Sequence, residues 1–309
     1  MMSWQGKIDC PERMLEAIRY YGIVPFFRCG IPGWSIEEMT PAECWFMSSQ
    51  QLGPWDWKID VIQSGEVAYG KYLRRKAGFA TAEYYGHLLN WRRSQERYRI
   101  LADVDGPMAP GCSGGQKGRK APGTVDDRIK NGDPKTVDDR LNALMAKVAL
   151  DAIKEFGSLE SAELRQLLEE RIPAQDRKSV GGHMEKYLLP KIKKTALDFT
   201  LQYLEMGCYV LTGDFQRVYR GPNCEYSGWQ RASLTTPEAL FGTQNQDSQN
   251  NNTQNNEPFW ARFIDESACG SDNNSFIPDC TPQESYRILS DRITALFPGS
   301  EKELAKLLL

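Results

Sequence analysis

The stretch from Lys194 to Phe241, KTALDFTLQYLEMGCYVLTGDFQRVYRGPNCEYSGWQRASLTTPEALF, decides the fold. Its first part has Leu197, Leu201 and Leu204 at the spacing of one helix face, which predicts a helix over residues 196–206. Gly207 follows and ends the helix, because glycine readily adopts the backbone conformation found at helix ends.

Strands are expected directly after this helix. An apolar strand is predicted over 208–211 and an alternating one over 216–220. Gly-Pro-Asn at 221–223 favours a turn, so that residues 228–232 can return as the paired strand. The stretch is therefore expected to be a helix that leads into a β-hairpin.

Two helices are expected upstream, a long one over 137–156 and a short one over 162–170 with Ser161 as its N-cap. Three helices and a two-stranded wing form the order of a winged helix-turn-helix. That fold most often binds nucleic acid, but it also serves in dimerisation and protein docking. The fold by itself does not dictate which use applies.

The first hundred residues predict a similar set of elements. An amphipathic helix is expected over 11–21, a capped helix start at 40–43, and a further helix from Trp55 to about Gly65. A short hairpin with a charged tip is expected over 68–80, and a helix after Thr81. This half is therefore a candidate for a second, divergent winged helix.

Composition limits the function classes. The net charge of −3 over 309 residues excludes a general nucleic-acid coat, so binding would need a local basic face. Basic clusters occur at 71–76, 91–99 and 186–194, although each can also be an ordinary solvated surface. No apolar run reaches membrane-spanning length and the N-terminus has no signal core, so we expect a cytoplasmic protein that does not enter a membrane.

The eight cysteines are scattered, without a Cys-x-x-Cys pair, and only two histidines are present. Zinc-ligand spacing is absent, so no metal and no cofactor are expected. No sequence feature selects a Cys–His pair for nucleophilic chemistry.

The expected fold class is α+β, mostly α, with winged helix-turn-helix architecture. Five parts are expected along the chain: an N-terminal helical and hairpin domain over 1–102, a flexible loop over 103–135, a winged-helix domain over 136–242, a disordered Asn/Gln-rich linker over 243–257, and a C-terminal helical segment over 258–309.

Several local patterns resemble one family. They are YGIVPFF at 21–27, PWDWKID at 54–60, YGK at 69–71, GF at 78–79 and GW at 228–229. Together they are similar to the AlkZ-related proteins, a bacterial family placed beside the AlkZ-type DNA glycosylases, which are built from tandem winged helices. The resemblance covers about 10–100 and 138–241, and it implies a winged-helix architecture and a link to DNA and its repair.

The resemblance does not carry over an activity. AlkZ-type glycosylases use a glutamine, a hydrophobic residue and then glutamine or aspartate to excise alkylated bases. The similar triplet here is Gln244-Asn245-Gln246, whose middle residue is polar and which lies in the Asn/Gln-rich tract, where no rigid site can be held. Glycosylase chemistry is therefore absent, or other residues perform it.

Asp56 and Asp60 are the candidate catalytic residues, because they lie four apart on one helix face and could act as a general acid and base. In the structural alternative the neighbouring tryptophans are core, and Asp60 pairs with an arginine such as Arg74 or Arg92.

Residues on the expected recognition helix and wing are the candidates for contact with double-stranded DNA. The lysines at the helix start can neutralise phosphates, polar side chains on the helix can meet a groove, and arginines lie along the wing. Acids at 198, 205, 214 and 225 would repel a duplex. The candidates are Lys191, Lys193, Lys194, Thr200, Gln202, Tyr203, Arg217, Arg220 and Arg231.

The sequence thus favours a DNA-associated winged-helix protein without the usual glycosylase motif. Two alternatives stay open: a DNA repair glycosylase that acts on alkylated bases through other carboxylates, and a protein-interaction scaffold with no nucleic-acid role.

Overall fold

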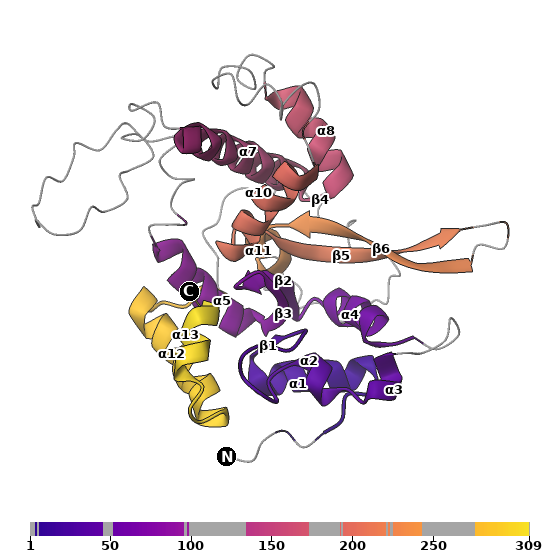
Figure 1. Ribbon diagram of the computed structural model, residues 1–309, viewed down its shortest axis with the longest axis vertical. Helices are drawn as coiled ribbons and strands as arrows, with labels where there is room; N and C mark the ends of the chain where they lie inside the picture. Colours follow the sequence, from indigo (N-terminus) through magenta and orange to yellow (C-terminus); the bar gives the residue numbers. More distant parts are fainter. Residues whose placement is uncertain are drawn as a thin grey trace, which may run out of the picture.

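A computed structural model shows an α+β protein that is mostly helical, as the sequence predicts, and whose described strands form one antiparallel six-stranded sheet (Figure 1). The structure describes residues 4, 6–45, 52–95, 98, 134–172, 192, 194–220, 222, 225–242 and 276–308. For 134–143, 195, 196, 220 and 225–229 it describes the backbone alone. The loop was expected over 103–135; residues 103–133 lie outside the described residues, as does the linker at 243–257, whereas 134 and 135 belong to a helix and not to a loop.

The first unit of the fold consists of helices followed by a hairpin. Its elements are α1 Pro11–Tyr21, β1 Ile23–Pro25, α2 Ile36–Met39, α3 Ala42–Trp45, α4 Pro54–Gln63, β2 Val67–Leu73 and β3 Lys76–Thr81. Helix α1 starts at a proline and buries Met14, Ala17, Ile18 and Tyr21 on one face. Gly22, with φ of 79°, ends it.

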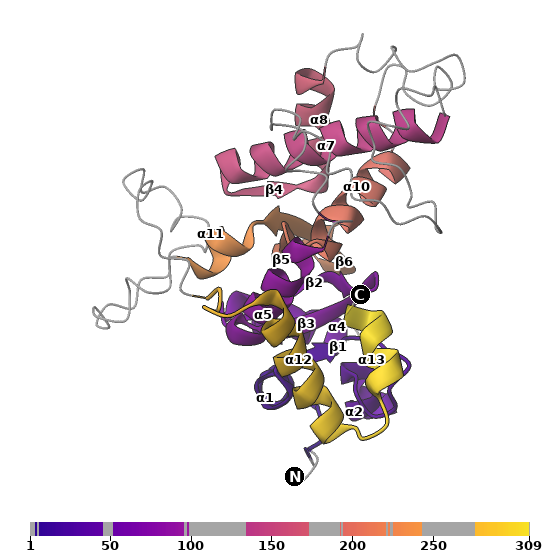
Figure 2. The same ribbon diagram turned by 90° about the vertical axis from the view of Figure 1, so that its left-hand side faces the viewer.

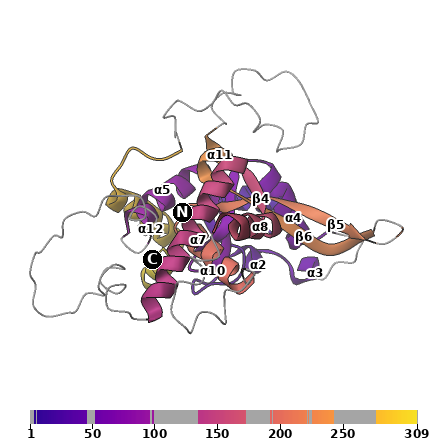
Figure 3. The same ribbon diagram turned by 90° about the horizontal axis from the view of Figure 1, so that it is seen from above.

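The second unit has the same kind of order. Its elements are α7 Pro134–Phe156, β4 Ser158–Glu160, α8 Ser161–Arg171, α10 Lys194–Met206, β5 Leu211–Arg220 and β6 Glu225–Thr235. The β5–β6 hairpin reaches well beyond the rest of the sheet (Figures 1 and 3). It is longer than the β2–β3 hairpin, which reverses at Arg74 and Arg75 with φ of 47° and 67°.

The remaining helices pack around the first unit. They are α5 Ala82–Ser94, α11 Pro237–Phe241, α12 Pro282–Leu296 and α13 Glu301–Leu308. Helix α12 packs along α5, and Thr281 and Glu284 form the capping box that its sequence predicts. In Figure 2 these C-terminal helices lie beside the first unit, while α7, α8 and α10 lie on the other side of the sheet.

The sheet repeats one pairing pattern in mirror order, β1-β3-β2-β5-β6-β4. In each unit the short first strand pairs with the last strand, which pairs with the middle one. The two middle strands, β2 and β5, then join antiparallel at Tyr69 and Thr212. The two units therefore have the same topology and meet at their middle strands.

The helix that precedes the hairpin in each unit packs on the hairpin of the other unit. Helix α4 lies against β5, and α10 lies against β2. One core cluster fills the first unit and extends to Leu211, Leu240 and the C-terminal helices. A second, made mainly by α7, α8 and α10, fills the second unit. The division into the five expected parts stays a prediction, but the sheet itself is continuous across 1–102 and 136–242.

Two local predictions were wrong. The strand expected over 208–211 begins only at Leu211, because Cys208 has φ of 58° and lies in the turn after α10. Glu160, not Ser161, is the N-cap of α8, in a capping box with Glu163. The helix start expected over 40–43 is present, since α3 begins at Ala42, and Thr40 also ends α2 by donating its hydroxyl to the Ile36 carbonyl at 2.7 Å.

Candidate nucleic-acid interface

Helix α10 holds most of the candidates for the recognition helix. Lys194 is exposed at its start, and Gln202 and Tyr203 are half-buried. Thr200 is only 1% exposed, so its hydroxyl does not face solvent in this structure. Tyr203 packs against the core of the second unit, with its ring 6.0 Å from that of Tyr98. Lys191 and Lys193 lie outside the described residues.

The outer face of α10 is mixed in character. Asp198 is exposed, and Phe199 next to it is 52% exposed. Glu205 is instead buried at 6% exposure. Its burial raises the pKa of its carboxyl to about 7, opposed by the Lys71 charge and by the Lys71 backbone N–H that donates to it. Glu205 therefore faces β2 and the first unit, where it does not meet an approaching duplex.

The arginines of the hairpin differ in their exposure and in their ion-pair contacts. Arg217 points back to α4, where its guanidinium lies 3.3 Å from an Asp60 oxygen and 3.7 Å from an Asp56 oxygen. Arg231 is 64% exposed, with Glu160 at 3.9 Å. The strand position of Arg220 is described, but its side chain lies outside the described part. Of the three, Arg231 is the one that the structure shows with an exposed guanidinium.

The two aspartates of α4 are held by the hairpin of the second unit. Besides the Arg217 contacts, the Gln230 amide donates to Asp56 Oδ1 at 3.3 Å and to the Trp55 carbonyl at 2.9 Å. The expected arginine partner of Asp60 exists, but it is Arg217 and not Arg74 or Arg92. This correction follows from the packing of β5 on α4, which brings together residues 157 positions apart.

Arg92 has a purely structural environment. It is fully buried and donates to the carbonyls of Tyr72, Met206 and Leu307 at 2.8–3.0 Å, and to the Tyr98 hydroxyl at 3.0 Å. It therefore ties β2, the end of α10 and α13 together. The neighbouring Arg93 donates to the Cys208 carbonyl and pairs with Glu238. These two residues of the basic cluster at 91–99 stabilise the fold.

Sequence reasoning missed Lys58, which is 3% exposed. Its ammonium lies 4.4 Å from the Trp55 ring centre and 4.2 Å from that of Phe215 on β5. Burial lowers the pKa of Lys58 to about 8, opposed by the charge of Asp56. The available signal was helical spacing, since residues 54, 57, 58, 61 and 62 form the buried stripe of α4.

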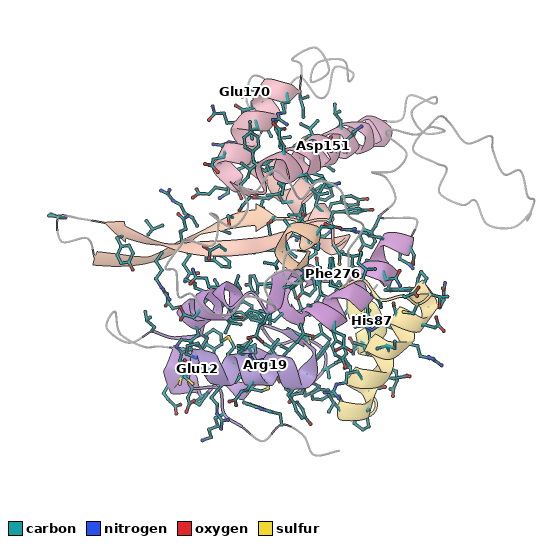
Figure 4. All side chains as sticks on the ribbon, turned by 180° about the vertical axis from the view of Figure 1, so that it is seen from behind. Glu12, Arg19, His87, Asp151, Glu170 and Phe276 are labelled. Atoms are coloured by element: carbon teal, nitrogen blue, oxygen red, sulfur yellow. The ribbon has the colours of Figure 1, made fainter. Side chains whose placement is uncertain are left out.

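A second group that no motif selected lies between α5 and α12, where Figure 4 shows His87. Ser285 Oγ is 3.2 Å from both His87 Nδ1 and Cys280 Sγ, and the latter two atoms are 3.9 Å apart. Asn90 donates to Ser285 Oγ at 2.9 Å. Burial lowers the pKa of His87, opposed by the charge of Glu83, and this favours the neutral imidazole. These side chains join the C-terminal helices to the first unit.

The described residues contain neither a membrane-spanning helix nor a cluster of metal-binding side chains. None of the described helices is long and apolar enough to cross a membrane. No group of three or more His, Cys, Asp or Glu side chains within the described ranges has the arrangement of a metal site.

The fold and the interface define a class: an α+β protein in which two helix-and-hairpin units of one topology share a single sheet. The model of the AlkZ-related family matches residues 8–104 and 131–266. The chain belongs to this family, as its motifs predicted. No curated protein matches the chain, and no solved structure matches it.

Proposed function

We propose that this chain is a DNA-associated protein built from two winged helices, of which the second binds duplex DNA. The observation that supports the proposal is the order of elements. Each unit begins with a helix and a short strand, continues with further helices and ends in a hairpin, and its short strand pairs with the last strand of the hairpin. Membership of the AlkZ-related family adds the link to DNA.

In the second unit, α10 would act as the recognition helix and the β5–β6 hairpin as the wing. Phosphate contacts would come from Lys191, Lys193 and Lys194 at the start of α10, and from Arg220 and Arg231 on the wing. Gln202 and Tyr203 would present polar groups to the groove. Arg217 and Thr200 would instead support this surface, because one is bound to Asp56 and Asp60 and the other is buried.

The proposal does not assign catalysis to Asp56 or Asp60. Both carboxylates are engaged by Arg217, and Asp56 also accepts from Gln230. Their contacts hold the root of the hairpin on α4, which is the structural alternative that the sequence left open.

The test is fluorescence anisotropy with labelled duplex DNA, plain and alkylated, at two salt concentrations. Because each phosphate contact releases counterions, affinity should fall steeply as salt rises. Replacing Lys191, Lys193 and Lys194 by alanine should weaken binding on every sequence and reduce the salt slope by roughly one unit per lost contact.

The matched control replaces exposed cations on the C-terminal helices, Arg287 and Lys302, by alanine. These helices lie away from the hairpin (Figure 1), so the control should bind like the unaltered protein. Absence of binding at low salt, or equal loss in both variants, would contradict the proposal and favour a protein-interaction scaffold. Release of alkylated bases would show glycosylase activity.

A further inference from the structure

The environment of the Lys58 ammonium differs from that of an ordinary structural lysine. A buried ammonium is normally paired with a carboxylate or bonded to carbonyls, since an isolated buried charge is costly. Within the described residues, Lys58 has no hydrogen bond or ion pair within 4 Å. Its immediate neighbours are instead the faces of Trp55 and Phe215. Cation–π attraction offsets only part of the cost of desolvation.

The carboxylates that could neutralise the Lys58 charge are paired with other side chains. Asp56 and Asp60, on the same helix, have their carboxylates turned to Arg217 and Gln230 of the opposite hairpin. These two carboxylates therefore hold the hairpin, and the Lys58 amine lies between two aromatic rings. Such an arrangement favours loss of the proton and leaves an unprotonated lone pair on the nitrogen, which is the requirement for a nucleophilic amine.

Access to this amine depends on one side chain. Trp55 forms the outer wall and is 48% exposed, whereas Phe215 belongs to the sheet. Phe27, 36% exposed, lies beside Trp55 with ring centres 5.4 Å apart. Rotation of the Trp55 ring would open the amine to solvent. The two exposed rings are surfaces on which a nucleobase can stack next to the amine.

We propose that Lys58 is a nucleophilic amine that forms an imine with an aldehyde, and that its natural aldehyde is the ring-opened C1′ of an abasic site in DNA. The Lys58 nitrogen bonds to the aldehyde carbon, the carbonyl oxygen leaves as water, and the nitrogen gives up two protons in forming the C=N bond. Borohydride then supplies a hydride that reduces this bond to a stable secondary amine. The DNA part of the inference rests on the proposed function.

The protonation state of Lys58 supports the step. With its pKa lowered to about 8, roughly a quarter of the side chain is free amine at pH 7.5, against about one part in a thousand for an ordinary lysine. An exposed lysine such as Lys302 therefore provides the matched comparison.

The experiment treats the full chain with an abasic-site duplex and borohydride at pH 7.5, and measures the covalent protein–DNA product. Lys58→Met keeps the apolar stem and removes the amine, and Lys302→Met is the control. We expect the product in the unaltered protein and in the control, at least tenfold less in Lys58→Met, and the modified peptide to contain Lys58. Thermal unfolding of each variant confirms that it is folded.

A protein that binds the abasic duplex but forms no product, or forms it equally in Lys58→Met, would overturn the inference. Failure to bind any DNA would instead refute the proposed function. In that case glycolaldehyde with borohydride decides on the amine alone: at least tenfold faster labelling of Lys58 than of Lys302 supports it, and equal or slower labelling overturns it.

Discussion

The two units share a topology but differ in the exposure of the helix that precedes each hairpin. Helix α4 is covered by the opposite hairpin, because Arg217 and Gln230 bind its aspartates and Phe215 covers Lys58. Helix α10 buries Glu205 against β2 but leaves Lys194, Asp198 and Phe199 exposed. A repeated topology therefore does not repeat the exposed surface, and of the two described units the second is the one that combines a partly exposed helix with a long hairpin.

The two units also contribute opposite charges to the junction between them. The first unit contributes a buried lysine and the second a buried glutamate, each on the helix that precedes the hairpin and each facing the other unit's hairpin. Burial lowers the pKa of Lys58 and raises that of Glu205, so both groups move toward neutrality near physiological pH. The junction is therefore packed around two buried groups that change protonation state near physiological pH.

Replacing Arg92 by methionine should have the largest effect on this junction. The guanidinium satisfies carbonyls from β2, α10 and α13, and its loss leaves them buried without a donor. We expect a loss of about 3–5 kcal/mol in the free energy of unfolding, measured by denaturant titration. Arg13→Met, which removes an exposed pair with Glu16, should change stability by less than about 1 kcal/mol. Equal losses would show that Arg92 does not join the units.

Glu205→Gln should change how stability depends on pH. The folded pKa of about 7 lies above the ordinary value of 4.5, so the folded state binds more protons than the unfolded state between these values. Stability should therefore fall as pH rises from about 4.5 to 7 and then level off.

The glutamine variant lacks this loss, because it carries no charge at any pH. It should equal the unaltered protein near pH 4.5 and exceed it by about 2–3 kcal/mol at pH 8. Chemical denaturation at the two pH values measures both numbers. Parallel pH profiles for the two proteins would mean that Glu205 is not desolvated at the junction.

Arg217→Met should have a smaller, local effect. Removing the guanidinium frees Asp56 and Asp60 and loosens the root of the β5–β6 hairpin on α4, at a cost of about 1 kcal/mol because the contacts are partly exposed. Amide exchange in β5 should accelerate more than in β2. Arg231→Met, on the exposed side of the same hairpin, should leave both stability and exchange nearly unchanged. A larger effect of Arg231→Met than of Arg217→Met would contradict the claim that Arg217 holds the hairpin on α4.

The sequence predicted those parts of the fold that have local signals. The helix over 11–21, the hairpin over 68–80 and the helix after Thr81 follow from proline, capping residues and periodicity, all within a few residues. The family followed from short motifs, and the family model matches most of the chain.

The site could be predicted only in part. The pairing of Asp60 with an arginine was foreseeable in kind, but its partner lies 157 positions away and depends on how β5 packs on α4. Helical spacing places Lys58 on the buried stripe of α4, but the groups that surround Lys58 and Glu205 come from the other unit. Contacts of such sequence separation leave no local pattern, and the side chains at the junction of two units were therefore the ones missed.

The most direct test of this account is hydrogen–deuterium exchange of the full chain, with and without undamaged duplex DNA at low salt. If the second unit binds DNA, protection should appear in α10 and the β5–β6 hairpin, while α4 and the β2–β3 hairpin should exchange as in the free protein. Protection confined to α4 and β2–β3, or none with DNA in excess, would contradict the claim that the two units differ in this way.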